Sequence, residues 1–285
     1  MLWNGNNGTL KNCNFINNTA KLNGGAIVWD GPNGSIFDSI FVNNTALNSV
    51  GGGVYWNNRN GLISDSNFIN NVATNTAGGV FWSPRASNGK LTSSTFTSNN
   101  ATTAGGGVAW QGANGILISS NFTDNYANLG GAVDWWGDNG NLTDSNFTNN
   151  IAGRGGAIYW DGDYGILSSS KFSLNTALND NGGAVYWEGN NGNLIYSTFT
   201  NNNAKSNGGA IYWFIGGSIT NCTFNNSKWS RSNAIYAAKD LNVTGGNGIV
   251  EIFAGGTLSG ASIIVLNNET YYYPPNTNIN LTDKQ

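Results

Sequence analysis

Apolar residues fall in short runs along the chain, and segments rich in Asn and Gly separate them. The segment FINNTAKLNGGAIVW (15–29) is framed by a Phe and a Trp and has no helical apolar stripe. A Ser or Cys stands two residues before such a Phe, and Ile or Val stands two before such a Trp. Residues two apart lie on one face of a strand. The pattern therefore predicts short β-strands joined by turns.

Near-copies of this segment recur, and two aromatic markers keep the same period. Successive Phe markers are 25–28 residues apart, and so are successive Trp markers counted from Trp3. The Phe series is Phe15, Phe41, Phe68, Phe96, Phe122, Phe147, Phe172, Phe199 and Phe224. The Trp series is Trp29, Trp56, Trp82, Trp110, Trp135, Trp160, Trp187 and Trp213. Two independent markers with one period make chance a poor explanation.

Polar residues keep the same register. An Asn stands three residues after the Phe in eight of nine copies, and Ser227 is the exception. Because an amide side chain both donates and accepts hydrogen bonds, stacked Asn residues can bond to the repeats above and below. We expect this series to lie at a bend: Asn18, Asn44, Asn71, Asn99, Asn125, Asn150, Asn175 and Asn202.

A period near 26 residues is too short for a helix plus strands but fits one coil of a β-solenoid. We predict an all-β fold, a right-handed single-stranded parallel β-helix of about 9–10 rungs stacked ~4.8 Å apart. The repeats occupy residues 1–236. Residues 237–266 are expected to form a degenerate terminal rung or cap, and 267–285 a linker towards a missing C-terminal domain. Because the first residues match the middle of a repeat, we expect the chain to be part of a longer protein.

The Phe and Trp series are expected to fill much of the interior, where each buried ring contributes roughly 1.5–3 kcal/mol. An alternative for the Trp series is an exposed aromatic strip that stacks on sugar rings. The residue before each Trp varies from Tyr159 to Asp134, and we expect a position that accepts both to face outward.

Cys13 and Cys222 both occupy the Ser position of the repeat. Eight rungs separate them, which is roughly 38 Å at the rung spacing. A disulfide needs Cα atoms within about 7 Å of each other. The sequence therefore predicts two free, buried cysteines.

Composition narrows the function. Of 285 residues, 52 are Asn and 41 are Gly, yet aromatic residues make up 12%, which favours an ordered core over disorder. The net charge of −3 and the lack of a basic cluster argue against nucleic-acid binding. No apolar run approaches 18 residues, so we expect no membrane span. The absence of His excludes His-based triads and His metal sites, and we expect no cofactor.

Carboxylates on neighbouring rungs are the candidate catalytic or metal-binding groups. Asp38 and Asp65 are equivalent positions, and so are Asp161 and Glu188, with Asp163 nearby. Such pairs could perform acid/base work or hold Ca²⁺. No Lys or Arg recurs beside them, so solvated turn charge is the favoured interpretation.

Two surface patterns remain. Thr95/Thr97 and Thr198/Thr200 bracket Phe residues as an ice-binding ladder would, but Asn121, Asn146, Lys171 and Ser173 interrupt the series. Asn-x-Ser/Thr sequons are frequent and include Asn17, Asn43, Asn121, Asn146 and Asn242. They fit a glycosylated surface protein, and they also arise by chance in a chain rich in Asn and Thr.

The motifs FINN, FVNN and FTNN, in register with GGAI and GGAV, resemble the repeats of chlamydial polymorphic membrane proteins. The added Trp and the Asn-rich background resemble adhesin-like surface proteins of methanogenic archaea. The resemblance covers about residues 3–236 and implies a secreted or surface-anchored β-helix that mediates attachment. The motif residues are scaffold residues, so no binding residue is carried over.

The leading hypothesis is a non-catalytic extracellular adhesin or stalk module whose partners are surface proteins or glycans of another cell. The segments between the Asn series and the paired glycines vary in length, which makes them the first candidates for a contact surface. The alternative is a polysaccharide-active β-helix enzyme of the lyase or glycosidase type, which three or more charged side chains in one groove would favour. An ice-binding solenoid is the remote alternative.

Overall fold

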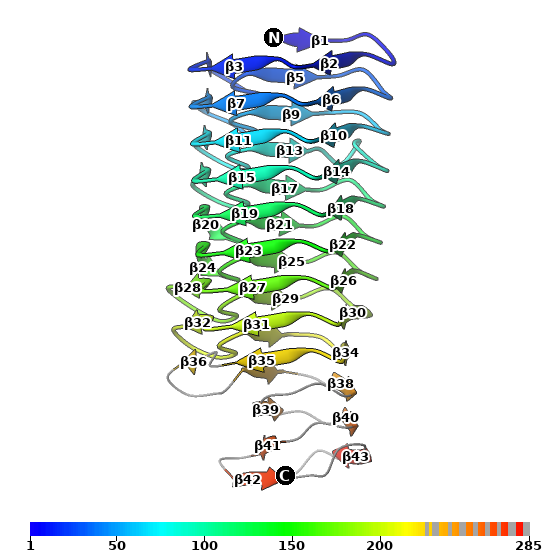
Figure 1. Cartoon of the computed structure of the whole chain (residues 1–285), viewed down its shortest axis with the longest axis vertical. Helices are drawn as coiled ribbons and strands as arrows, with labels where there is room; N and C mark the ends of the chain where they lie inside the picture. Colours follow the sequence, from blue (N-terminus) through cyan, green and yellow to red (C-terminus); the bar gives the residue numbers. More distant parts are fainter. Residues whose placement is uncertain are drawn as a thin grey trace.

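The computed structural model describes residues 1–225, 228–229, 234–238, 241–244, 249–252, 256–259, 263–266, 269–272 and 278–281. Throughout these residues the regular structure is β-strand. The chain winds as a parallel β-solenoid of about nine turns, and the rungs follow one another from the N-terminus to the C-terminus along the long axis (Figure 1). The predicted all-β parallel β-helix is confirmed. No described helix is long and apolar enough to cross a membrane.

Each of the first nine rungs contributes one strand to each of four sheets, here named A to D in chain order, and the described strands after β36 belong to sheets A and B. Sheet A holds the strand that ends at the Trp marker: β1 Leu2–Trp3, β5 Ile27–Trp29, β9 Val54–Trp56, β13 Val80–Trp82, β17 Val108–Trp110, β21 Val133–Trp135, β25 Ile158–Trp160, β29 Val185–Trp187, β33 Ile211–Trp213, β37 Ile235–Ala237, β39 Ile249–Ile252, β41 Ile263–Leu266 and β42 Glu269–Tyr272. Sheet B holds the strand that follows: β2 Thr9–Lys11, β6 Ser35–Phe37, β10 Leu62–Ser64, β14 Lys90–Thr92, β18 Ile116–Ile118, β22 Asn141–Thr143, β26 Ile166–Ser168, β30 Gly192–Ile195, β34 Gly217–Thr220, β38 Leu241–Thr244, β40 Gly256–Ser259 and β43 Asn278–Leu281.

Sheets C and D complete each rung. Sheet C carries the Phe marker: β3 Asn14–Ile16, β7 Ile40–Val42, β11 Asn67–Ile69, β15 Thr95–Thr97, β19 Asn121–Thr123, β23 Asn146–Thr148, β27 Lys171–Ser173, β31 Thr198–Thr200 and β35 Thr223–Asn225. Sheet D is narrower: β4 Thr19–Ala20, β8 Thr45–Ala46, β12 Val72–Ala73, β16 Asn100–Ala101, β20 Tyr126–Leu129, β24 Ile151–Arg154, β28 Thr176–Ala177, β32 Asn203–Ala204 and β36 Lys228–Trp229.

Strand pairing places equivalent residues of neighbouring rungs opposite one another, as in Phe68 with Phe96 and Trp82 with Trp110. Near the C-terminus β42 and β43 pair antiparallel with β41 and β40. Both strands fall within the stretch predicted as a linker. Parts of that linker and of the predicted terminal rung lie outside the described residues, and so does Ser227.

The two aromatic series form parallel ring stacks inside the solenoid. Ring centroids of neighbouring Trp residues lie 4.6–5.0 Å apart, and those of neighbouring Phe residues also lie 4.6–5.0 Å apart. From Trp29 to Trp213 the indoles are fully buried. The Trp series was expected either to fill the interior or to form an exposed aromatic strip, and the structure places it in the interior. These indoles are therefore not available to stack on a ligand.

The Asn series lies at the bend between sheets C and D, and its amides are linked from rung to rung. The side-chain nitrogen of Asn125 donates to Oδ1 of Asn150 at 3.0 Å and to the carbonyl of Phe96 at 2.9 Å. Its Oδ1 accepts bonds from the backbone and side-chain nitrogens of Asn99, both at 3.0 Å. From Asn44 to Asn202 these side chains are buried, while Asn18 in the first rung is exposed. The fully bonded amides explain how a polar ladder is tolerated inside the fold.

The corners explain why Asn is so abundant. In a single rung Asn33, Asp38 and Asn43 each occupy a bend with positive φ (57°, 48° and 53°), and equivalent corners repeat along the chain. Asn and Asp adopt this left-handed conformation more readily than most residues. These corners, added to the buried Asn series, favour Asn in most repeats, although Tyr164, Ser169 and Leu174 fill the three corners of one rung.

One glycine per rung fits closely against the Trp stack. A Cβ on Gly165 would lie 2.4 Å from Nε1 of Trp160, and one on Gly140 would lie 2.3 Å from Nε1 of Trp135. Only glycine allows the turn after sheet A to approach the indole this closely.

Both cysteines are free, as predicted. Cys222 is buried, but the expectation that Cys13 is also buried was wrong. Cys13 belongs to the first rung, where an inward side chain has a covering neighbour on one side of the stack only.

Candidate functional site on the outer face of sheet A

The outer face of sheet A carries two columns of side chains, because the Trp of each strand points inward and its neighbours point outward. The residue before each Trp from Trp29 to Trp213, continued by Tyr236 before the equivalent Ala237, forms what we name the inner column: Val28, Tyr55, Phe81, Ala109, Asp134, Tyr159, Tyr186, Tyr212 and Tyr236. The residue after each of these positions forms the rim column: Asp30, Asn57, Ser83, Gln111, Trp136, Asp161, Glu188, Phe214 and Ala238. The rim column changes residue type from rung to rung, unlike the interior series, whereas the inner column varies up to Asp134 and is Tyr from Tyr159 onwards.

The inner column faces away from the solenoid core, but it is not exposed as the sequence suggested. Tyr159, Tyr186 and Tyr212 are buried and form a small apolar cluster against which Leu129 packs. Further towards the N-terminus, Phe81 and Ala109 form a second cluster with Ala77. The segments between sheets D and A contribute to this cover, since Ala77 belongs to one of them. These segments were expected to supply the contact surface, and at this rung part of the segment packs against the column instead.

The tyrosines of the inner column stack on one another, with ring centroids 5.2 Å apart for Tyr159 and Tyr186 and 4.8 Å for Tyr186 and Tyr212. The guanidinium of Arg154 lies 5.7 Å from the centre of the Tyr186 ring and forms a 2.5 Å ion pair with Asp180. Burial, followed by the charge of Glu188, raises the pKa of Tyr186 to about 12. These rings remain neutral at physiological pH, and their stacking holds the outer face of sheet A in one conformation.

Three carboxyl groups gather on this face. The Tyr159 hydroxyl donates a hydrogen bond to Glu188. Asp161 follows Trp160 as Glu188 follows Trp187, so the two carboxylates occupy equivalent positions on neighbouring rungs. Burial raises the pKa of Asp161, and the charges of Glu188, Asp163 and Asp138 raise it further. Asp134 is only 2% exposed, and burial raises its pKa to about 8. Asp134 is therefore mostly protonated at neutral pH.

Asp163 belongs to the adjoining turn and not to the sheet face. Its backbone N–H donates to Oδ1 of Asp138 at 2.9 Å, and its own Oδ1 accepts the backbone N–H of Asn190 at 2.7 Å. These bonds tie successive turns together. In the described part of the chain no three acidic or sulfur ligands come together in a way that could hold a metal ion.

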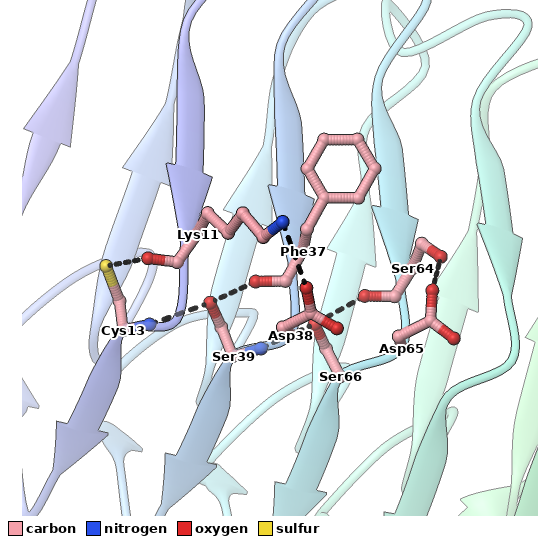
Figure 2. A network of polar contacts seen from close by, with 8 residues as sticks. All are labelled: Lys11, Cys13, Phe37, Asp38, Ser39, Ser64, Asp65 and Ser66. Atoms are coloured by element: carbon pink, nitrogen blue, oxygen red, sulfur yellow. Dashed lines mark hydrogen bonds and ion pairs between the residues drawn. The ribbon is translucent and has the colours of Figure 1, made fainter.

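Asp38 and Asp65 sit at the corners between sheets B and C, where both are exposed with positive φ (Figure 2). Asp38 forms an ion pair with Lys11 at 3.7 Å, and Asp65 is bonded by the hydroxyl of Ser64. Beside them a Ser/Cys ladder runs from rung to rung: the Cys13 N–H donates to the Ser39 hydroxyl, which donates to the carbonyl of Phe37. These two aspartates complete turns and do not form a reactive pair.

Sheet C presents the sequon and Thr residues. Asn121 and Asn146 are exposed and joined by a 2.8 Å side-chain bond, while Asn17 and Asn43 occupy corners with positive φ. A further sequon residue, Asn242, is exposed in β38. Lys171 stands opposite Asn146 and Thr198 in register. Ser173 stands opposite Thr148 and Thr200, so both outward columns of this sheet are interrupted at the positions that the sequence indicated.

The sequence reasoning missed Trp136, Phe214 and Arg154, and used Asp134 only as a sign of outward orientation. Trp136 is 49% exposed and Phe214 is 37% exposed. The doublet Trp135–Trp136 was the available signal, because strand alternation sends the second indole outward when the first is in the core.

The repeats have a counterpart among known families. Residues 12–28, 144–159 and 196–212 match the model of the Chlamydia polymorphic membrane protein repeat. Each match begins at the positive-φ corner before sheet C and ends at the residue before the Trp marker, so it includes the Asn series and the paired glycines. The chain thus carries repeats similar to this family's repeats. No curated protein and no solved structure matches the chain.

Proposed function

We propose that this chain is a non-catalytic extracellular module that attaches a cell surface to proteins or glycans of another cell. The similarity of its repeats to those of polymorphic membrane proteins supports a surface location. The resemblance to adhesin-like proteins of methanogenic archaea, noted from the sequence, fits the same function.

One observation carries the proposal. The inward positions hold the same residue type rung after rung, whereas the rim column runs through Gln111, Trp136, Asp161, Glu188 and Phe214. The repeated inward residues are what a stacked scaffold needs. The rim residues are not required for stacking, so they are free to form a specific binding surface. The stacked, hydrogen-bonded rungs hold that surface rigidly, which lowers the entropy lost on binding.

The gathering of Asp134, Asp161 and Glu188 is the observation that keeps a polysaccharide-active enzyme as the alternative. Asp134 is covered, however, and Glu188 is already bonded by the Tyr159 hydroxyl. A general acid or base must reach the proton that it transfers. The arrangement favours binding over bond cleavage.

Beads coated with the folded chain, or with the same chain after denaturation, would test attachment on a panel of cells. The proposal predicts saturable adhesion of the folded chain that soluble folded chain competes away, together with no release of reducing ends from polysaccharides. Absence of adhesion on every cell type, or steady release of reducing ends that stops in Glu188→Gln, would overturn it.

A further inference from the structure

We propose that the rim column from Trp136 to Phe214 binds an uncharged oligosaccharide that lies along the solenoid axis. This inference rests on the proposed attachment function and names the class of ligand that the attachment site takes.

The four rim residues are held in register on consecutive rungs. The backbone N–H of each residue donates to the carbonyl of the Trp one rung earlier, at 2.8 Å for Trp136, 2.7 Å for Asp161, 2.7 Å for Glu188 and 2.8 Å for Phe214. The two aromatic residues are therefore three rungs apart, about 14 Å at the spacing of paired strands. This span accommodates a short chain of sugar rings.

The indole of Trp136 is fixed before any ligand arrives. Its Nε1 donates to Oδ1 of Asp134 at 3.0 Å, and Asp134 is itself held within the packed inner column. Nearly half of the Trp136 side chain is nevertheless exposed. A pre-oriented aromatic surface loses little conformational freedom on binding, which favours affinity.

Hydrogen-bond acceptors lie between the two aromatic residues. Asp161 and Glu188 occupy the intervening rungs, and the Tyr159 hydroxyl orients the Glu188 carboxylate. Carboxylates accept strong hydrogen bonds from hydroxyl groups. A pyranose has an apolar C–H face that packs on an aromatic ring and hydroxyl groups at its edge, so its chemistry matches both parts of the column.

The charges on this face select against anionic chains. Asp161 and Glu188 repel sulfated or carboxylated sugars, and Arg154, which lies over the Tyr186 ring, is paired with Asp180. The rungs nearer the N-terminus carry Asp30, Asn57, Ser83 and Gln111 at the same position and offer no ring. The proposed site is therefore confined to one half of the solenoid.

The test uses the full chain and three uncharged probes, namely cellohexaose, mannohexaose and chitohexaose, in calorimetry and saturation-transfer NMR. We expect at least one probe to bind, and a heparin-type hexasaccharide not to bind. Trp136→Ala and Phe214→Ala should each weaken binding about tenfold or more, on the scale of aromatic anchors in interfaces. Trp136→Phe should retain part of the affinity, and it replaces the Ala variant if that variant does not fold.

Tyr164→Ala and Tyr196→Ala are matched controls, because these side chains are 59% and 64% exposed and lie at other corners. They should leave the affinity unchanged. Oligosaccharide binding that is insensitive to Trp136 and Phe214 would overturn the proposed site. Adhesion to cells that is abolished by protease, unaffected by glycosidases and accompanied by no probe binding would identify a protein ligand, overturning this inference while the attachment function stands. Absence of both cell adhesion and probe binding would overturn both the attachment function and the oligosaccharide site.

Discussion

The indole N–H of Trp136 donates a hydrogen bond to Oδ1 of Asp134, two residues earlier in the same rung, at 3.0 Å. The bond joins the covered inner column to the exposed rim column. It places a carboxyl group that is almost fully removed from water directly beneath an aromatic side chain on the surface. The protonation of Asp134 is therefore linked both to the stability of the rung and to the orientation of the ring.

Asp134→Asn should change how stability depends on pH. The pKa of Asp134 is about 8 in the folded chain, against about 3.9 for an exposed aspartate. Between these values the folded state binds more protons than the unfolded state, so the folded state becomes less stable as pH rises from about 4 to about 8. The Asn variant keeps an acceptor for Trp136 and removes the ionisation. Urea midpoints at pH 5 and pH 8 should differ less in the variant than in the parent.

Asp144→Asn is the control for that experiment, because Asp144 is an exposed corner residue with positive φ. It should leave the pH dependence as it is in the parent. If the stability of the parent and of Asp134→Asn depended on pH in the same way, the raised pKa of Asp134 would be contradicted.

Asn125→Ala should destabilise the solenoid by about 3 kcal/mol or more, because several buried groups each lose a hydrogen bond together. The groups affected are the two nitrogens of Asn99, Oδ1 of Asn150 and the carbonyl of Phe96. Asn100→Ala, at an exposed position of β16, should have a small effect. Denaturant unfolding followed by Trp fluorescence would measure both variants, and equal effects would show that the ladder is not a source of stability.

Gly165→Ala should disturb the Trp stack. The new methyl group would lie 2.4 Å from Nε1 of Trp160, and overpacking of this kind typically costs about 1–3 kcal/mol. Gly5→Ala is the milder counterpart, since its Cβ would stand 3.3 Å from Nε1 of Trp3 in the first rung. Near-ultraviolet circular dichroism should change in Gly165→Ala and stay as it is in Gly5→Ala. An unaltered spectrum for Gly165→Ala would contradict the close fit.

The two thiols should react at very different rates. Burial raises the pKa of Cys222 to about 12, and Cys222 is almost completely covered, whereas Cys13 is partly exposed. The thiolate is the reactive form. Titration with a disulfide reagent should therefore detect one thiol promptly in the folded chain and two after denaturation. Prompt reaction of both thiols without denaturant would contradict the buried position of Cys222.

The fold was predictable because the interior series repeat. Phe96 and Phe122, or Trp110 and Trp135, occupy equivalent inward positions, and that equivalence is visible as a period in the sequence. Burial of Tyr186 was not predictable in the same way. It depends on what covers the inner column, and the segments between sheets D and A that contribute to this cover change in length and composition from rung to rung.

The candidate site was only partly predictable for a related reason. Asp161 and Glu188 were recognised as equivalent positions on neighbouring rungs, and the structure brings them together. The residues that complete the candidate site beside them are Trp136, Phe214 and the covered Asp134. These residues occur once each and leave no periodic signal.

The central claim is that attachment occurs through the outer face of sheet A, and bead adhesion to cells tests it most directly. The double variant Trp136→Ala/Phe214→Ala should lose most adhesion while keeping the thermal unfolding midpoint and near-ultraviolet spectrum of the parent chain. The matched double variant Tyr164→Ala/Tyr196→Ala should adhere as the parent does. Full adhesion by the first variant, or its loss only in the second, would contradict the claim.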